Sequence, residues 1–359
     1  MSTINLFSDT QTLPSRDMRA AIADAELGDE QRGTDPSVNR LCERVADMLG
    51  FEAALFAPSG TLCNQIAILV HCRPGDELLC DASAHVANTE AGGAAALAGT
   101  GIRAISTPDG RFGARDILPL LRPPSVSAPR PRLLVVEQTV NFLGGRVWPL
   151  DQLREAVVTA GTAGLTAHLD GARLLNAVAA SGVSARAFAA ESGFASAWIA
   201  LSKGLGCPAG AVLCGSRDFI DEAWRWKYRL GGAMRQAGIL AAAGLYALDH
   251  NVARLPEDHR RARMLAAGLA DRFPGCVTQD TVETNIVIID TIPLCRPAAE
   301  IARACAVAGL QLSVIGEHEL RAVTHLDITD GDIERATALF ADSLASMAPP
   351  TVPHPLAMA

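Results

Sequence analysis

The stretch that decides the fold is Trp198-Ile199-Ala200-Leu201-Ser202-Lys203-Gly204-Leu205-Gly206, in which an amine follows a run of mostly apolar residues. The pattern predicts a buried strand that ends at a glycine-rich turn carrying Lys203. Lysine is costly to bury, because its charge must leave water. A desolvated lysine also loses its proton more readily and becomes a nucleophile for carbonyl groups. Lys203 is therefore a candidate catalytic residue.

A second apolar stretch that ends on a charge is Ala167-His168-Leu169-Asp170-Gly171-Ala172-Arg173. Two charged groups that each terminate a strand-like run are the skeleton of a pyridoxal phosphate site, in which Lys203 forms the Schiff base and Asp170 pairs with the ring nitrogen. The protonated ring then stabilises negative charge at the substrate Cα. An ordinary strand-end cap is the alternative for Asp170. Arg173 follows within reach of the cofactor's phenolic oxygen or of a substrate carboxylate.

A phosphate seat is predicted at Ser59-Gly60-Thr61, between the apolar segment 52–57 and a helical stretch over 62–71. The start of a helix offers free backbone N–H groups and a positive dipole end, and glycine lets a phosphate come close. An ordinary helix cap is the alternative. Because the cofactor needs a phosphate seat, we assign Ser59, Gly60 and Thr61 to it.

Three further side chains are candidates for the same site. His85 follows a strand-like run, so its flat ring is suited to stack on a flat cofactor and to exchange a proton, although a structural role is the alternative. Glu90 lies five residues on and is a base, a partner of His85 or a solvated surface residue. Arg321 sits in a strand pattern, where its planar fork matches a carboxylate in two-point contact. A surface salt bridge is the alternative for Arg321.

Composition narrows the class of protein. The 359 residues are 49% hydrophobic, enough for one large and one smaller domain, and this excludes global disorder. The net charge is −8 and no long basic run is present, which favours a small-molecule partner over nucleic acid. Nine scattered cysteines form no C-x-x-C pair, as is typical of reduced thiols, and we assign no metal site. Without a signal peptide or an apolar run of roughly 20 residues, we expect a soluble cytoplasmic protein with no membrane partner.

Strand and helix patterns alternate along most of the chain. This order predicts an α/β fold with a mostly parallel sheet covered by helices on both faces. The predicted strands are 77–80, 133–136, 166–169, 197–201 and 210–214. The predicted helices include 16–25, one that Asp35-Pro36-Ser37 starts and that runs to about Leu49, 150–160 and 217–227.

The pattern changes after about Ala247. Strands over 285–289, 312–314 and 320–324 combine with helices over 255–269, 297–308 and 330–346 into a compact α+β unit. We therefore predict four parts, namely an N-terminal arm (1–15), a large cofactor-binding domain (16–247), a small C-terminal domain (248–347) and a disordered tail (348–359).

The joint order of these motifs closely resembles that of the threonine aldolase family of pyridoxal phosphate enzymes, over nearly the whole chain up to about Phe340. The resemblance implies the fold type I, aminotransferase-like architecture and a homo-oligomer, usually a tetramer built as a dimer of dimers with active sites at the interface. The motifs that carry it are Phe7-Ser8-Asp9-Thr10, Gly33-Thr34-Asp35-Pro36-Ser37-Val38-Asn39-Arg40-Leu41, Ala57-Pro58-Ser59-Gly60-Thr61, Glu90-Ala91-Gly92-Gly93, Gly144-Gly145-Arg146-Val147, His168-Leu169-Asp170-Gly171-Ala172-Arg173, Leu201-Ser202-Lys203-Gly204-Leu205-Gly206, Gly231-Gly232-Ala233-Met234-Arg235-Gln236 and Val323-Thr324-His325-Leu326-Asp327.

The family's residue roles fall on matching positions. The resemblance implies that Lys203 holds the cofactor covalently, Asp170 holds the ring nitrogen and His85 stacks on the ring. It implies that Gly60 and Thr61 hold the phosphate, with Arg235 of a neighbouring subunit reaching it. It also implies that the substrate carboxylate faces Ser8, Arg173 and Arg321.

Two positions depart from the family pattern. The family segment Glu-Asn-Thr-His-Asn is Glu137-Gln138-Thr139-Val140-Asn141 here, and the family's tyrosine in Tyr-Gly-x-Asp-Pro is Arg32. The histidine that normally faces the substrate's β-hydroxyl is therefore Val140, which cannot form a hydrogen bond. We expect Val140 and Arg32 to set the substrate side chain. A valine wall favours a bulkier apolar or aromatic side chain, as in phenylserine, whereas an arginine favours an acidic group.

The resemblance implies reversible cleavage of an L-β-hydroxy-α-amino acid (L-threonine, L-allo-threonine or phenylserine) to glycine and an aldehyde. His85, Glu90 or a bound water is the candidate base that takes the β-hydroxyl proton. A β-eliminating lyase or a racemase on the same scaffold is the alternative, because only the bond broken differs. A cofactor-sensing regulator is a third hypothesis, but it needs an added DNA-binding module, for which we expect no space beyond the tail.

Overall fold

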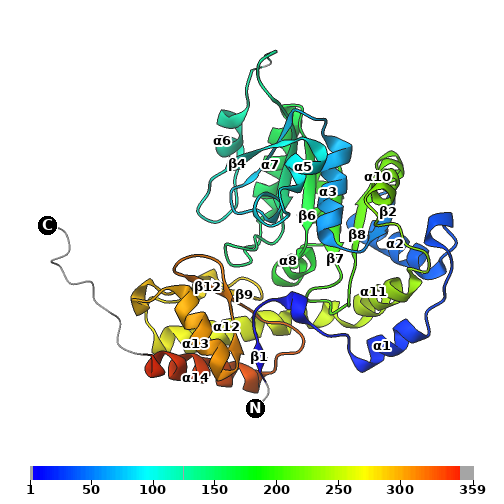
Figure 1. Cartoon of the computed structure of the whole chain (residues 1–359). Helices are drawn as coiled ribbons and strands as arrows, with labels where there is room; N and C mark the ends of the chain where they lie inside the picture. The colour runs from blue at the N-terminus through cyan, green and yellow to red at the C-terminus, as the bar shows by residue number, and fades with distance from the viewer. Residues whose placement is uncertain (1–2, 124, 348–359) are drawn as a thin grey trace.

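The computed structural model describes residues 3–123 and 125–347, and its centre is a seven-stranded sheet (Figure 1). The strands lie in the order β2-β8-β7-β6-β5-β3-β4. Their bounds are β2 (Ala53–Ala57), β3 (Asp76–Asp81), β4 (Gly101–Ile105), β5 (Arg130–Glu137), β6 (Thr166–Gly171), β7 (Ser196–Ala200) and β8 (Ala211–Gly215).

The sheet is mostly parallel, as the alternating pattern predicts. β4, β3, β5, β6 and β7 run parallel to their neighbours, whereas β8 is antiparallel to both β7 and β2. Because β8 runs against both neighbours, β2 points the same way as the parallel strands. The carboxyl ends of β2, β3, β5, β6 and β7 therefore meet at one edge of the sheet.

Both faces of the sheet are covered by helices, and successive residues of one strand show it. In β5, Leu134 and Val136 join one hydrophobic cluster, while Leu133 and Val135 join another on the opposite face. The helices of this part are α1 (Arg16–Ala23), α2 (Pro36–Leu49), α3 (Gly60–His71), α4 (His85–Asn88), α5 (Gly93–Ala98), α6 (Ala114–Ile117), α7 (Leu150–Thr162), α8 (Leu174–Ser181), α9 (Ala185–Phe188), α10 (Arg217–Arg229) and α11 (Gly238–His250).

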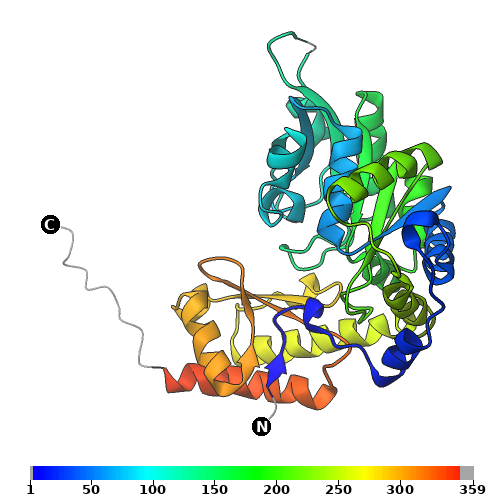
Figure 2. The same ribbon diagram turned by 45° about the vertical axis from the view of Figure 1, so that its right-hand side comes forward.

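The C-terminal part, which is coloured yellow to red in Figure 2, has its own antiparallel sheet. It also has its own hydrophobic cluster. The N-terminal strand β1 (Ile4–Asn5) pairs in parallel with β10 (Leu310–Gln311), so the predicted arm docks on the C-terminal part. The other elements are α12 (Leu255–Arg272), β9 (Ile286–Asp290), α13 (Ala298–Ala308), β11 (Ser313–Val314), β12 (Glu319–Val323) and α14 (Asp330–Ser346). The domain boundary at 247 stays a prediction, and the predicted tail lies outside the described residues.

The sequence also leads to predictions about membrane-spanning segments and about the cysteines. Within residues 3–123 and 125–347, no helix has both the length and the apolarity that crossing a bilayer requires. All nine cysteines are free thiols.

Candidate active site

Several of the predicted site residues lie at the edge where the parallel strands end, and Glu137, for which no role was predicted, lies beside them. Asp170 lies at the end of β6, Lys203 follows β7, Glu137 ends β5 and His85 begins α4 after β3. Ligands of open α/β sheets bind at this edge. One pocket there is lined by Thr10, Gly60, Thr61, His85, Glu137, Asn141, Asp170, Ala172, Arg173, Trp198, Ala200, Ser202 and Lys203.

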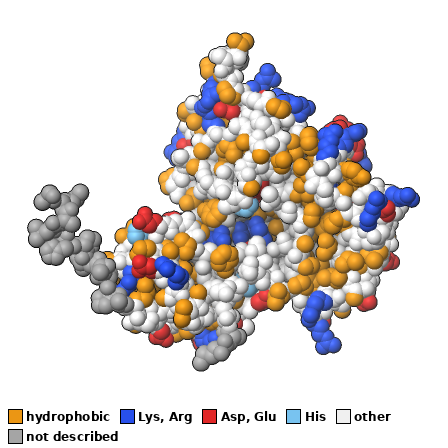
Figure 3. Space-filling model, viewed as in Figure 1, with side chains coloured by type: hydrophobic (Ala, Val, Ile, Leu, Met, Phe, Trp, Pro, Cys, Tyr) orange, Lys and Arg blue, Asp and Glu red, His pale blue; other side chains and the backbone are white. Residues whose placement is uncertain are grey.

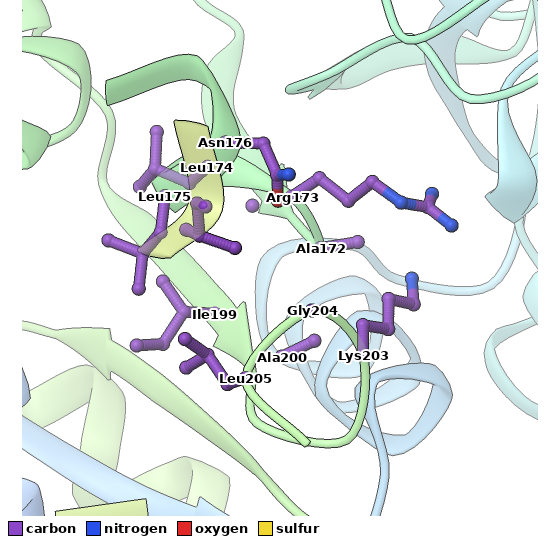
Figure 4. Close-up of a pocket in the computed structure, with 12 residues that line it drawn as sticks. Ala172, Arg173, Leu174, Leu175, Asn176, Ile199, Ala200, Lys203, Gly204 and Leu205 are labelled. Carbon is purple, nitrogen blue, oxygen red and sulfur yellow. The ribbon is translucent and has the colours of Figure 1, made fainter. Parts of the chain in front are cut away.

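The charged ends of Lys203 and Arg173 lie on the same side of Ala172, away from the neighbouring apolar side chains. Figure 4 shows both charged ends directed past Ala172, while Leu174 and Ile199 lie on the other side. Figure 3 shows Lys and Arg side chains gathered in a hollow near the middle of this face of the molecule. Burial, together with the charge of Arg173, lowers the pKa of the Lys203 amine. A lowered pKa is what a nucleophilic lysine requires.

The Asp170 carboxylate is buried, and each of its two oxygens accepts one hydrogen bond. Its Oδ1 accepts from the backbone N–H of Ala172 at 3.1 Å, and its Oδ2 accepts from the side-chain amide of Asn64 at 2.8 Å. Burial raises the pKa of Asp170 even though Lys203 lies nearby. A buried carboxylate of this kind is stabilised by a cationic partner, which a protonated ring nitrogen supplies.

The predicted phosphate seat is the first turn of α3. Ser59 caps the helix by accepting from the backbone N–H of Leu62 at 3.2 Å, whereas Gly60 and Thr61 line the pocket. The Cβ of any other residue at position 60 would lie 2.1 Å from the Trp198 ring, so only glycine fits beneath the indole. The first N–H groups of a helix have no partner within it, so this turn can bind an anion.

His85 is held by two carboxylates. Its Nδ1 lies 2.9 Å from Glu90 Oε1, and its backbone N–H donates to Glu137 Oε2 at 2.7 Å. Burial alone lowers the pKa of His85, but the Glu90 hydrogen bond and the charge of Asp170 outweigh it and raise that pKa. Glu90 also accepts from Asn64 and Gln65, at 2.7 Å each. Glu90 is thus the buried partner of His85 and does not line the pocket.

Arg173 and Arg321 meet at one amide oxygen. Asn141 Oδ1 accepts from Arg173 Nη1 at 3.1 Å and from Arg321 Nη1 at 2.7 Å. Arg173 also donates from Nε and Nη2 to the two oxygens of Asp9, at 2.8 and 2.7 Å. Burial and the charge of Arg173 lower the pKa of Arg321 to about 10. Arg321 does not line the pocket and reaches it through Asn141, which does. On its other side, Arg321 Nε donates to the Ser313 hydroxyl at 3.2 Å.

Besides Ser59, Glu90 and Arg321, four more predicted residues do not line the pocket. The Ser8 hydroxyl accepts from the backbone and side chain of Thr10, which is the pocket-lining residue of that turn. Arg32 is 81% exposed beside Asp29, and Arg235 is also exposed and donates to the same carboxylate at 3.2 Å.

Val140 is the fourth, and the structure corrects its predicted place. Its side chain is 2% exposed and belongs to the main hydrophobic cluster, where it packs against Gly110. The next residue, Asn141, faces the pocket instead. Val140 therefore forms no wall of the pocket, because successive residues of this bridged segment point to opposite sides.

Asp9, Asn64, Glu137 and Asn141 are buried polar residues of the site that sequence reasoning left without a role. Asn64 carries a detectable signal, since it interrupts an otherwise apolar face of α3 one turn after Gly60. Burial, reinforced by the charge of Asp170, raises the pKa of Glu137 to about 7.

The lysine count is a second overlooked signal. The chain has two lysines, Lys203 and Lys227. Lys227 is 0% exposed, bound to Glu30 and placed over the Trp224 ring, 4.4 Å from its centroid. Lys203 is thus the lysine whose amine faces the pocket.

Among the described residues, no group of three His, Cys, Asp or Glu side chains is arranged to hold a metal ion.

Comparisons with known proteins identify the family to which the chain belongs. The family model described as Beta-eliminating lyase matches residues 5–292. A low-specificity L-threonine aldolase of Escherichia coli K12 is 39% identical over 93% of this chain and 97% of its own length, and a probable low-specificity L-threonine aldolase 2 of Arabidopsis thaliana is 38% identical over 94% and 96%. The chain therefore belongs to the family of beta-eliminating lyases that includes the low-specificity L-threonine aldolases, as the sequence resemblance predicts.

Solved structures confirm the fold. A threonine aldolase of Leishmania major superposes with a TM-score of 0.81 at 18% identity, covering 95% of this chain and 99% of that one. A serine palmitoyltransferase of S. paucimobilis with bound PLP gives a TM-score of 0.73 at 18% identity, covering 95% and 87%. The fold is thus the fold type I architecture of pyridoxal phosphate enzymes.

Proposed function

We propose that this chain is a pyridoxal 5'-phosphate-dependent aldolase that reversibly cleaves L-β-hydroxy-α-amino acids to glycine and an aldehyde. The observation that carries the proposal is that Lys203 and Asp170 face one pocket at the ends of adjacent parallel strands. The relatives named low-specificity L-threonine aldolases support it. The expected substrates are L-threonine, L-allo-threonine and phenylserine.

The donor set of the pocket fits this cofactor. In this proposal the Lys203 amine holds the cofactor covalently, the Asp170 carboxylate pairs with its ring nitrogen and the His85 ring stacks on it. The N–H groups of Gly60 and Thr61 are the seat for its phosphate. When bound, the cofactor supplies an electron sink for the negative charge that develops at the substrate Cα.

Arg321 and Arg173 are the proposed anchor for the substrate carboxylate. Asp9 occupies two nitrogens of Arg173, which leaves the edge near Asn141 for the substrate. Asn141 bridges the two guanidinium groups and so sets their spacing. A carboxylate held at two points fixes the orientation of the Cα–Cβ bond that breaks. Ser8 is the third proposed contact of the carboxylate, and its hydroxyl accepts from Thr10, which lines the pocket.

His85 is the proposed base for the β-hydroxyl proton. Glu90 is excluded from this role because its side chain is fully buried and accepts hydrogen bonds from Asn64, Gln65 and His85. The hydrogen bond between Glu90 and Nδ1 of His85 orients the ring, as a carboxylate orients a catalytic histidine, and leaves Nε2 for the substrate.

The proposal extends to the assembly and the compartment. A homotetramer, built as a dimer of dimers, would bring the exposed Arg235 and Arg32 of one subunit to the pocket of another. Mixing Lys203→Ala with Arg235→Gln, which are each expected to be inactive alone, tests this arrangement. Subunit exchange should restore part of the activity if Arg235 acts on a neighbour. Absence of any recovered activity would contradict a site shared between subunits.

The nine free thiols favour the cytoplasm as the compartment of the protein.

Product analysis tests the function. The protein loaded with pyridoxal 5'-phosphate is incubated with L-threonine, L-allo-threonine and phenylserine. Glycine and an aldehyde in equal amounts are the expected products. Ammonia and a keto acid would instead establish β-elimination, the second candidate, which the name of the matching family model favours. Inversion at Cα without cleavage would establish a racemase, and the Lys203→Ala variant is the control.

A further inference from the structure

Asn64 lies where two buried carboxylates of the site come together. It is 1% exposed, and its side-chain nitrogen donates to Asp170 Oδ2 at 2.8 Å and to Glu90 Oε1 at 2.7 Å. An amide nitrogen carries two hydrogens, so both are used. We propose that Asn64 is a positioning residue that fixes Asp170 and, through Glu90, His85, and that a relay from His71 through Ser196 and His168 fixes Asn64 itself.

The orientation of the Asn64 amide follows from its other neighbours. Its Oδ1 accepts from Trp198 Nε1 at 2.7 Å and lies 3.2 Å from His168 Nε2. An indole N–H is a donor only, so the atom that faces Trp198 is the oxygen. A flipped amide would place its NH2 group against the indole N–H and its oxygen against two carboxylates. The amide therefore has one stable orientation.

The protons of the relay follow in turn. Burial, with a contribution from the charge of His71, lowers the pKa of His168 to about 3, so His168 is neutral near pH 7. Because His168 Nε2 donates to Asn64, its Nδ1 accepts, and the Ser196 hydroxyl donates to it at 2.7 Å. The single Ser196 proton is then used.

His71 must therefore donate from Nε2 to the Ser196 oxygen, 2.8 Å away. Burial, with a contribution from Arg132, lowers the pKa of His71 to about 4. Its ring stacks on Phe219 with the centroids 4.9 Å apart. Each hydrogen in the relay from His71 to Asp170 thus has one position.

This inference rests on the proposed function, because Asn64 acts on the proposed reaction through Asp170 and, by way of Glu90, through His85. Two buried carboxylates without donors raise each other's pKa, and one of them takes up a proton. Asn64 donates to Asp170 and Glu90 at once, and its hydrogen bond to Asp170 lowers the pKa of that carboxyl against the burial that raises it. An ionised Asp170 is required for the ring nitrogen, and the Glu90 carboxylate, held by Asn64, orients His85.

Two measurements test the inference. The first is the affinity of the apoprotein for pyridoxal 5'-phosphate, followed by fluorescence. Removing a hydrogen bond to a charged group costs about 1.5–3 kcal/mol, so Asn64→Ala should weaken binding roughly 10- to 100-fold. If wild type binds the cofactor and Asn64→Ala binds it equally well, this inference is wrong. If wild type binds none, the proposed function itself fails.

The second measurement is nitrogen NMR of the histidine rings in the apoprotein, which does not depend on Asn64→Ala folding. His71 and His168, assigned with His71→Gln and His168→Gln, should both be neutral and protonated at Nε2 between pH 6 and 8. Ser196→Ala should shift Nδ1 of His168, whereas the matched change Ser343→Ala, at a remote buried serine, should not. His168 protonated at Nδ1 would overturn the relay.

Discussion

The carboxylate of Asp9 and the guanidinium of Arg173 form a two-point ion pair, although 164 residues separate them in the chain. Both side chains are almost fully buried. The pair joins the N-terminal turn, which follows β1, to the end of β6. It therefore fixes the edge of Arg173 that is proposed to face the substrate.

Asp9→Asn is expected to destabilise the protein, because it leaves a buried charge on Arg173 without its counter-ion. Breaking a buried pair from one side costs about 3–5 kcal/mol. Although burial by itself raises the pKa of Asp9, the charge of Arg173 holds that pKa well below its usual range. The stabilisation is therefore complete above about pH 4 and is lost as the pH falls.

Urea unfolding at several pH values measures this contribution. The gap in unfolding free energy between wild type and Asp9→Asn should be full at pH 7 and should narrow below pH 4. The exposed change Asp17→Asn is the control. A gap that is absent at pH 7, or that widens in acid, would contradict the account.

Arg321→Gln is expected to raise KM for the amino-acid substrate more than it lowers kcat, because a charged anchor is lost. Losing a charge-assisted hydrogen bond of about 1.5–3 kcal/mol predicts roughly a 10- to 100-fold change in kcat/KM. Steady-state kinetics with L-threonine measure it, and the exposed Arg303→Gln serves as the control. An unchanged KM would remove Arg321 from the substrate site.

Glu137→Gln tests a carboxylate that accepts from two backbone N–H groups, those of His85 and Asn141. A glutamine offers one acceptor oxygen, so one N–H loses its partner. The pKa of Glu137 is raised to about 7 in the folded protein, against 4.5 as the ordinary value. Its protonation therefore stabilises the fold at low pH, and that stabilisation is lost as the pH rises from about 4.5 to about 7.

The expected result is that wild type loses stability relative to Glu137→Gln as the pH rises across that window. Thermal melts of both proteins at pH 5, 6, 7 and 8 measure it. A difference that stays constant with pH would mean that Glu137 does not titrate there.

Val140→Ala is expected to act on stability, because Val140 packs in the core. Removing two buried methyl groups costs about 2 kcal/mol. Val158→Ala, at a position that is 65% exposed, should cost almost nothing. Denaturant unfolding measures the stability of both variants. In Val140→Ala, the ratio of kcat/KM for phenylserine to kcat/KM for L-threonine should equal that of wild type. A changed ratio would restore Val140 to the substrate pocket.

The sequence predicts the residues that end strands at one edge of the sheet. Lys203, Asp170 and Gly60 are recognisable because a charge or a glycine interrupts an apolar run at each place. Val140 was misplaced because alignment to a motif gives its position in the chain but not the side of the segment that its side chain takes. Asn64 was missed because its partner Asp170 lies 106 residues away, and only folding brings the two together.

The central claim is that Lys203 holds the cofactor, and reduction with borohydride followed by peptide mass mapping tests it most directly. The chain offers its own comparison, since Lys227 is the second of two lysines and is bound to Glu30. After loading with pyridoxal 5'-phosphate and reduction, the account predicts the added mass of the reduced cofactor on the peptide with Lys203 and none on the peptide with Lys227. Modification at Lys227, or at neither lysine, would contradict it.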